Sequence, residues 1–175
     1  MEIRKIDKAH ASDLNLKNDL FPVCGRMIPE LKDGVWSYKI QRFADIGEMT
    51  FPDYPPDFDE LNRNGTAFGA YENGICVGNI ILKNGFFSYL YVEDLKVSAQ
   101  ARGKGVGKAL IREALAEASR RGYRGLYLQA QDNNLNACLF YLACGFQIGG
   151  FDNRVYTGTK QAGKADIFFY LDKEA

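Results

Sequence analysis

The chain of 175 residues has only one histidine, His10, and four cysteines, none of which forms a Cys-x-x-Cys pair. Zinc sites use cysteine and histidine at close spacing, and a cysteine nucleophile usually requires a histidine partner. We therefore expect no metal site and no cysteine-based catalysis. The cysteines are interpreted as reduced packing residues of a cytoplasmic protein.

An excess of charge and a long apolar run are also absent. Lysine and arginine together number 22, as do aspartate and glutamate, so the net charge is zero. This balance argues against a nucleic-acid binder driven by bulk charge. The start of the chain lacks the apolar core of a secretory signal, and asparagine and glycine interrupt the longest uncharged stretch, 133–151. We expect binding to neither nucleic acid nor membrane, and a monomer or a homodimer.

The composition, 46% hydrophobic and 25% charged, is typical of one soluble domain, predicted to span 1–175. An alternating pattern predicts strands before residue 97, with a hairpin at Asn73-Gly74. After Val97 the apolar period becomes that of helices, which Gly122 and Gly145 are expected to end. The expected fold is mixed α/β. Strands are predicted at 3–6, 34–40, 66–72, 75–83, 86–97, 125–129, 146–151 and 165–171, and helices at 57–63, 106–121 and 134–144.

A glycine-rich segment precedes the first long helix. Gly103, Gly105 and Gly107 alternate with cationic residues, so that backbone N–H groups can converge at the positive end of the helix dipole. This arrangement favours a diphosphate ligand, although a tight strand-to-helix connection would also use glycine. The dinucleotide motif is excluded because Lys108 stands at its third glycine, and the Gly-Lys-Ser/Thr ending of the nucleoside-triphosphate loop is missing.

Two motifs carry a resemblance to a known family. The pattern Gln100-x-x-Gly103-x-Gly105 after an acidic strand resembles the acetyl-coenzyme A loop of the GNAT acetyltransferase superfamily. Downstream, Asn134-x-x-Ala137-x-x-Phe-Tyr141-x-x-x-Gly-Phe is similar to a second mark of these enzymes. The resemblance implies a central, mostly antiparallel sheet flanked by helices, with a splayed strand pair that holds acetyl-CoA as cosubstrate. The acetyl-CoA contacts it implies are Leu95, Lys96, Val97, Gln100, Arg102, Gly103, Lys104, Gly105, Val106, Gly107, Lys108, Asn134 and Ala137.

The resemblance also divides the domain into an acceptor-side part (1–65), the acetyl-CoA-binding core (66–151) and C-terminal strands (152–175). Amide formation from a thioester needs a neutral amine and therefore a general base, for which Glu93 and Asp94 are candidates. Period-two geometry allows only one of them to face the amine unless a bulge intervenes, and the resemblance favours Glu93. It gives Tyr141 the role of general acid. Alternatively, the two acids are structural and the tyrosine is a core aromatic.

Further segments (25–29, 34–38, 91–97, 129–134 and 148–152) resemble streptothricin acetyltransferases, which acetylate an amine of the antibiotic's β-lysine moiety and so cause resistance. The strand at 166–171 departs from this pattern because it lacks an expected tryptophan. Other acceptors (a polyamine, an aminoglycoside or a protein N-terminus) and a non-catalytic acyl-CoA-binding module remain alternatives. Acids and aromatic walls suit a cationic acceptor, although each such residue could equally serve packing or solvation. The predicted acceptor-binding residues are Trp36, Tyr38, Asp152 and Tyr156.

Overall fold

The computed structural model describes residues 1–54, 56–85 and 87–173. It forms two compact units that interleave along the chain: 1–19 with 51–126 and 172–175, and 20–50 with 127–171. Each unit is described by itself below. In the described part of the chain, no helix is both long enough and apolar enough to cross a membrane.

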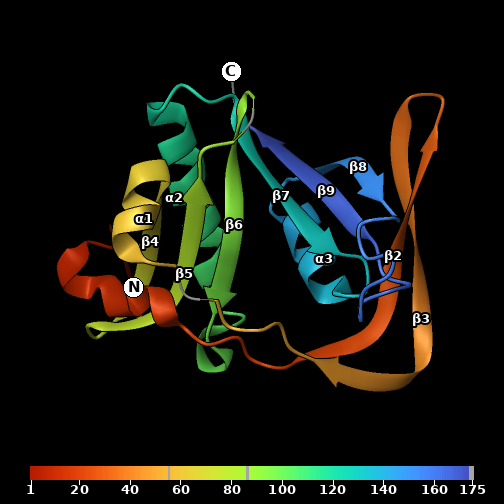
Figure 1. Ribbon diagram of the computed structural model, residues 1–175, viewed down its shortest axis with the longest axis horizontal. Coiled ribbons are helices and arrows are strands. Elements are labelled where there is room, and N and C mark those ends of the chain that lie inside the picture. The colour runs from red at the N-terminus through yellow and green to blue at the C-terminus, as the bar shows by residue number, and fades with distance from the viewer. Residues whose placement is uncertain (55, 86, 174–175) are drawn as a thin grey trace. The chain divides into compact units, whose positions relative to one another are not determined.

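The first unit is built on four antiparallel strands in the order β1-β4-β5-β6 (Figure 1). At the β4–β5 turn, Asn73 and Gly74 have φ angles of 50° and 80°, so the predicted two-residue hairpin is confirmed. The bounds of these strands are β1 (Glu2–Lys5), β4 (Gly65–Glu72), β5 (Ile75–Lys83) and β6 (Tyr89–Val97).

Helices cover both faces of these strands. The helices are η1 (Lys8–Asn15), α1 (Phe58–Asn64), η2 (Ala99–Ala101) and α2 (Val106–Arg120). A Cβ atom added to Gly78 on β5 would lie 3.1 Å from Val106 and 3.3 Å from Leu110, so this face of β5 packs against α2. Ile81 projects to the opposite face.

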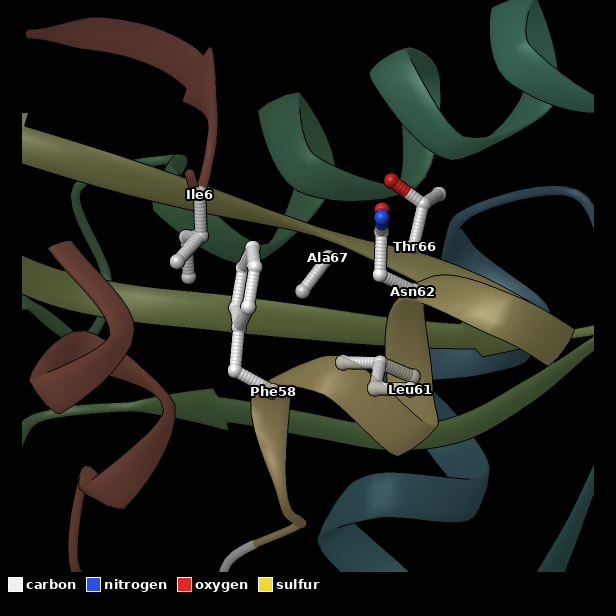
Figure 2. Close-up of a pocket in the computed structure, with 6 residues that line it drawn as sticks. All are labelled: Ile6, Phe58, Leu61, Asn62, Thr66 and Ala67. Atoms are coloured by element: carbon white, nitrogen blue, oxygen red, sulfur yellow. The ribbon is translucent and has the colours of Figure 1, made fainter. Parts of the chain in front are cut away.

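That opposite face holds a small apolar cluster of Ile6, Leu14, Leu61, Ala67 and Ile81. Figure 2 shows Phe58 and Leu61 extending from α1 over Ala67, with Ile6 beside the Phe58 ring. The hollow among these side chains has no room for a water molecule, so we interpret it as a packing feature.

Local sequence explains the ends of the helices. The Asp57 carboxylate accepts a 2.8 Å hydrogen bond from the backbone N–H of Glu60 and caps α1. Gly122, with φ of 79°, follows the last residues of α2, as its position in the sequence predicts. Glu117 and Arg121 form an ion pair of 2.6 Å along the last turn.

The second unit contains a smaller group of strands, helix α3 (Leu135–Ala143) and a long two-stranded ribbon. Strands β8 (Gln147–Asp152) and β9 (Asp166–Asp172) pair antiparallel, and β7 (Gly125–Gln131) lies next to β9 in the strand order. The ribbon consists of β2 (Phe21–Lys32) and β3 (Val35–Met49), which are antiparallel. The fold is therefore mixed α/β with mostly antiparallel strands and flanking helices, as predicted.

Three segments differ from the prediction. Strand β3 continues to Met49, well beyond the predicted end at 40, and β2 and η1 were not predicted. Pro22 and Pro29 concealed β2, because proline lacks the N–H group that a central strand needs; a two-stranded ribbon has free edges that accept it. Strand β6 begins at Tyr89 rather than 86, and Phe86 lies outside the described residues.

Candidate functional site

The glycine-rich segment forms an anion cradle at the start of α2. Gly103 and Gly105 adopt left-handed φ angles of 74° and 83°, and Gly105 is the N-cap of the helix. A Cβ atom at either position would meet no atom within 4 Å, so the cradle is open on that side. Within the described residues, the backbone N–H groups of 103–108 have no hydrogen-bond acceptor. Such a cradle fits the diphosphate of a nucleotide-type cosubstrate.

Three cationic side chains surround the cradle, and they differ in whether they are already paired within the protein. Arg102 is held in place: its Nε donates to the carbonyl oxygen of Val97 (3.1 Å), and its Nη2 lies 3.0 Å from the Asp19 carboxylate. The same Asp19 oxygen accepts a 2.9 Å hydrogen bond from the backbone N–H of Ala99. Lys104 and Lys108 are exposed and form no ion pair with any residue that the structure describes. Arg102 therefore shapes the loop, while the two lysines can meet an anion directly.

Other predicted cosubstrate residues lie beside the cradle in the first unit. Gln100 is exposed in η2, whereas Val106 is 1% exposed and packs on β5. Leu95 and Val97 are half-buried on β6, opposite Ile80 and Gly78. Strand, loop and helix start thus bring the predicted residues from 95 to 108 together, except that the Lys96 side chain projects to the opposite face of the sheet, toward Leu16.

A β-bulge changes the expected arrangement of the two acids on β6. Asp94 pairs with Ile81 and Val92 with Leu82, so Glu93 is an extra residue without a partner on β5. Asp94 shares the face of Ile81, as does Lys83 two residues along. The Glu93 carboxylate lies 2.5 Å from the Lys83 ammonium. Both carboxylates therefore lie on one face of the sheet. Strict alternation would have put them on opposite faces, and the bulge is the exception named in the sequence analysis.

The environments of the two acids differ. Burial raises the pKa of Asp94, although Lys96, with its Nζ 3.2 Å from the carboxylate, opposes this change. The Lys96 side chain is 9% exposed, and its ammonium also donates to the carbonyl oxygen of Leu16 at 3.0 Å. A carboxylate with a raised pKa is a better proton acceptor near neutral pH than an ordinary one.

The predicted residues of the second motif lie on α3 in the second unit. The Asn134 side-chain oxygen accepts from the backbone N–H of Ala137 (3.4 Å) and caps the helix, as predicted. Tyr141 is half-buried, and its ring centroid lies 5.7 Å from that of Phe146 and 5.8 Å from that of Phe169. An aromatic cluster therefore fixes the Tyr141 ring, which is compatible with a packing role and with a positioned hydroxyl.

The predicted acceptor-binding residues fall into two groups within the second unit. Trp36 and Tyr38 share one face near the tip of the ribbon, where Tyr38 is exposed. Asp152 ends β8 and accepts hydrogen bonds from the N–H groups of Arg154 (2.7 Å) and Val155 (3.0 Å), which gives it a role in the turn. Within the described residues, no hydrogen bond, ion pair or ring contact joins these two groups.

Tyr156 belongs to the same group as Asp152, because both lie beside Asp166. Its hydroxyl donates a 2.8 Å hydrogen bond to Asp166, and burial raises its pKa to about 12. Burial also raises the pKa of Asp166, which the sequence did not single out. Asp19, the anchor of Arg102, was missed as well. Neither aspartate belongs to a local motif, so only the folded chain identifies them.

No group of three or more histidine, cysteine or acidic side chains that could hold a metal ion occurs among the described residues. A mixed sheet, an anion cradle at a helix start and a neighbouring strand with two carboxylates on one face fit the class of enzymes that transfer acyl groups from a nucleotide-linked donor. Residues 31–146 match the model of the acetyltransferase (GNAT) family. The chain belongs to this family and is an N-acetyltransferase that uses acetyl-CoA, so the non-catalytic alternative falls away.

Within this family, the chain is similar to several individual enzymes. The chain is 35% identical over 169 residues to streptothricin acetyltransferase A of Bacillus subtilis (strain 168), which covers 96% of this chain and 98% of the relative. It is 33% identical over 118 residues to a streptothricin acetyltransferase of Escherichia coli, 67% of each chain. A solved structure described as a streptothricin acetyltransferase of Bacillus anthracis, in complex with acetyl coenzyme A, superposes with a TM-score of 0.89 at 30% identity and covers 98% of this chain and 99% of that one.

Proposed function

We propose that this enzyme transfers acetyl from acetyl-CoA to a primary amine of streptothricin, in its β-lysine moiety, and thereby inactivates the antibiotic. The observation that carries the proposal is the extent of the similarity to streptothricin acetyltransferase A, which includes 96% of this chain rather than only its cosubstrate core. Acceptor recognition depends on residues outside that core. A cytoplasmic location remains a prediction.

In the proposed reaction, acetyl-CoA supplies the acetyl group as a thioester. The N–H groups of 103–108, with Lys104 and Lys108, are assigned to its diphosphate, and the family resemblance assigns the Asn134 amide to the pantetheine arm. Arg102 keeps the loop in shape through Asp19. Unpaired donors and positive charge at the start of α2 support the assignment of the diphosphate.

The protein's catalytic task is proton transfer. A lysine-like amine has a pKa of about 10.4, so keeping it neutral at pH 7 costs about 4–5 kcal/mol. We assign the general base to the carboxylates at the bulge. The family resemblance favours Glu93, whereas the raised pKa of Asp94 favours Asp94 as the stronger proton acceptor. The Tyr141 hydroxyl is assigned as the proton donor to the leaving thiolate.

The test is an assay of free thiol release with purified enzyme, acetyl-CoA and a panel of amines. The panel contains streptothricin, a polyamine, an aminoglycoside and a peptide with a free N-terminus. We expect saturable release with streptothricin at a kcat/KM at least tenfold above the other amines, and mass spectrometry should detect one added acetyl group. If streptothricin causes no release, the proposal is wrong, and the amine that does cause release replaces it.

The same assay assigns the base. Loss of a general base typically costs about 10²–10⁴ in rate. We expect Asp94→Asn to lower kcat within this range and Glu93→Gln to lower it less. The reverse order would identify Glu93 as the base. Two unchanged values of kcat would remove both acids from the mechanism.

A further inference from the structure

Three carboxylates gather where β8 and β9 pair and β7 ends. Asp132 and Asp166 are 3% and 8% exposed, respectively. Asp152 on β8 lies directly opposite Asp166 on β9 in the antiparallel register. Like charges at directly opposed positions of an antiparallel pair repel each other. The arrangement therefore favours a compensating cation.

The protein's own cations compensate only part of this charge. The Asp132 carboxylate accepts from the N–H of Ala165 (3.1 Å) and lies 3.5 Å from Nε of Arg26. Asp166 receives only the neutral Tyr156 hydroxyl, at 2.8 Å. Lys164 directs its ammonium to Gln161 and Met49 instead. In the described part of the chain, Asp166 thus has no cationic partner.

An independent observation also indicates a missing donor. Gln131 is 6% exposed, and its amide interacts with the Tyr156 hydroxyl, which itself bonds to Asp166. The Oε1 atom of Gln131 is buried and has no hydrogen-bond donor. Native proteins rarely leave a buried carbonyl oxygen unpaired. Around Asp166 and Gln131 the acceptors therefore outnumber the donors, and the charged donor of the cluster, Arg26, lies beside Asp132 instead.

Aromatic rings line the same face. Tyr127 on β7 and Tyr170 on β9 stack with ring centroids 5.9 Å apart. Because side chains on a strand alternate between faces, Gln131 and Asp166 project to the side of this stack. The backbone N–H of Asp132 donates to Ala165 at 2.9 Å and holds the two strands together at this point. The stack lies four residues, about 13 Å, along the strands from Gln131 and Asp166, and the ring beside Asp166 is that of Tyr156. Carboxylate and carbonyl oxygens next to an aromatic ring suit an alkylammonium group.

We propose that Asp166, with Gln131 and Asp152 beside it, binds an ammonium group of the acceptor other than the amine that is acetylated. The inference rests on the proposed function. A β-lysine unit has two amino groups, so when one amine is the neutral nucleophile the other remains a cation. Asp166 then acts as a specificity residue that selects diamine-type acceptors over monoamines. Asp132 is not given this role because Arg26 already lies beside it.

The test compares wild-type enzyme with Asp166→Asn, which keeps the shape of the side chain and an acceptor for Tyr156. Streptothricin is the varied substrate, and acetyl-CoA is saturating. Charge-assisted hydrogen bonds are strong enough that we expect the KM for streptothricin to rise about 10- to 100-fold. We expect kcat to change less than about threefold and the KM for acetyl-CoA to stay the same. The control is Glu113→Gln, which removes one acid paired with Arg120 on α2 and should change neither KM.

Each outcome separates the inference from the proposed function. If wild-type enzyme acetylates streptothricin and Asp166→Asn has the same KM, the inference is wrong and the function stands. If wild-type enzyme does not acetylate streptothricin, the function is wrong; calorimetric titration of streptothricin into both proteins then decides the inference, and equal affinities overturn it. If Asp166→Asn does not fold, Asp166→Ser also removes the carboxylate while it keeps a small polar side chain, and an unchanged KM would likewise overturn the inference.

Discussion

The two ends of α2 offer a matched pair of glycines for testing the anion cradle. Gly105 precedes the helix with φ of 83°, and Gly122 follows it with φ of 79°. At both positions an added Cβ atom would meet nothing within 4 Å. Alanine at either site therefore introduces the same backbone strain without a steric clash, and only Gly105 belongs to the proposed diphosphate site.

The structure sets the expected magnitudes. Placing an L-residue in the left-handed region costs about 1–2 kcal/mol, which should lower Tm by about 2–8 °C in both Gly105→Ala and Gly122→Ala. In Gly105→Ala, relief of this strain would also rotate the donor N–H groups away from the anion, and the new methyl group would occupy the open side of the cradle. Loss of a single charge-assisted hydrogen bond is enough to weaken binding at least tenfold.

Isothermal titration of acetyl-CoA into the three proteins, together with thermal melts, checks this prediction. We expect similar melting temperatures for the two variants and weakened acetyl-CoA binding for Gly105→Ala alone. Equal affinity in wild-type enzyme and Gly105→Ala would refute the placement of the diphosphate. Equal weakening in both variants would show that affinity follows global stability and not the cradle.

Two further predictions concern the second unit. Burial raises the pKa of Asp166 above its ordinary value, so the ionised form of this group destabilises the fold, and the free energy of unfolding falls as pH rises from the unfolded-state pKa to the folded-state pKa. Urea melts should therefore show Asp166→Asn to be more stable than wild type at pH 7 and no more stable below pH 3. A less stable variant at pH 7 would contradict this. Asn134→Ala should lose about 1 kcal/mol through the missing α3 cap and raise the KM for acetyl-CoA, whereas Asn136→Ala, at an exposed position of the same helix, should do neither.

The regular elements were predictable where the local pattern was strong. The Asn73-Gly74 turn predicted its hairpin because both residues tolerate the positive φ angles that the turn requires. The amphipathic period and Gly122 predicted α2. The ribbon was predicted only in part, as a strand at 34–40, and β2 was missed although the turn between them has an equivalent signal: Asp33 and Gly34 have φ angles of 53° and 79° and form a two-residue hairpin turn. Prolines in β2 outweighed that signal, since they are unfavourable in most strands.

The candidate site was predictable only in part. Glycine spacing indicated the cradle because the required backbone conformations are local. The bulge at Glu93 could not be predicted, since it depends on the register between β5 and β6. The roles of Asp19 and Asp166 depend on contacts with residues that are distant in sequence or on neighbouring strands, and single-sequence patterns do not encode such contacts.

The hydrogen bonds that Asp19 forms with the loop before α2 limit which fragments of the enzyme can bind the nucleotide. Ala99 and Arg102 are bound by a residue that lies 80 and 83 positions earlier in the chain. A fragment that begins at β4 would contain every glycine of the cradle and yet lack the carboxylate that fixes its geometry. Closing so long a loop is also slow, because its entropy is lost before the contact forms. Nucleotide binding should therefore emerge late during folding, after the N-terminal segment has docked.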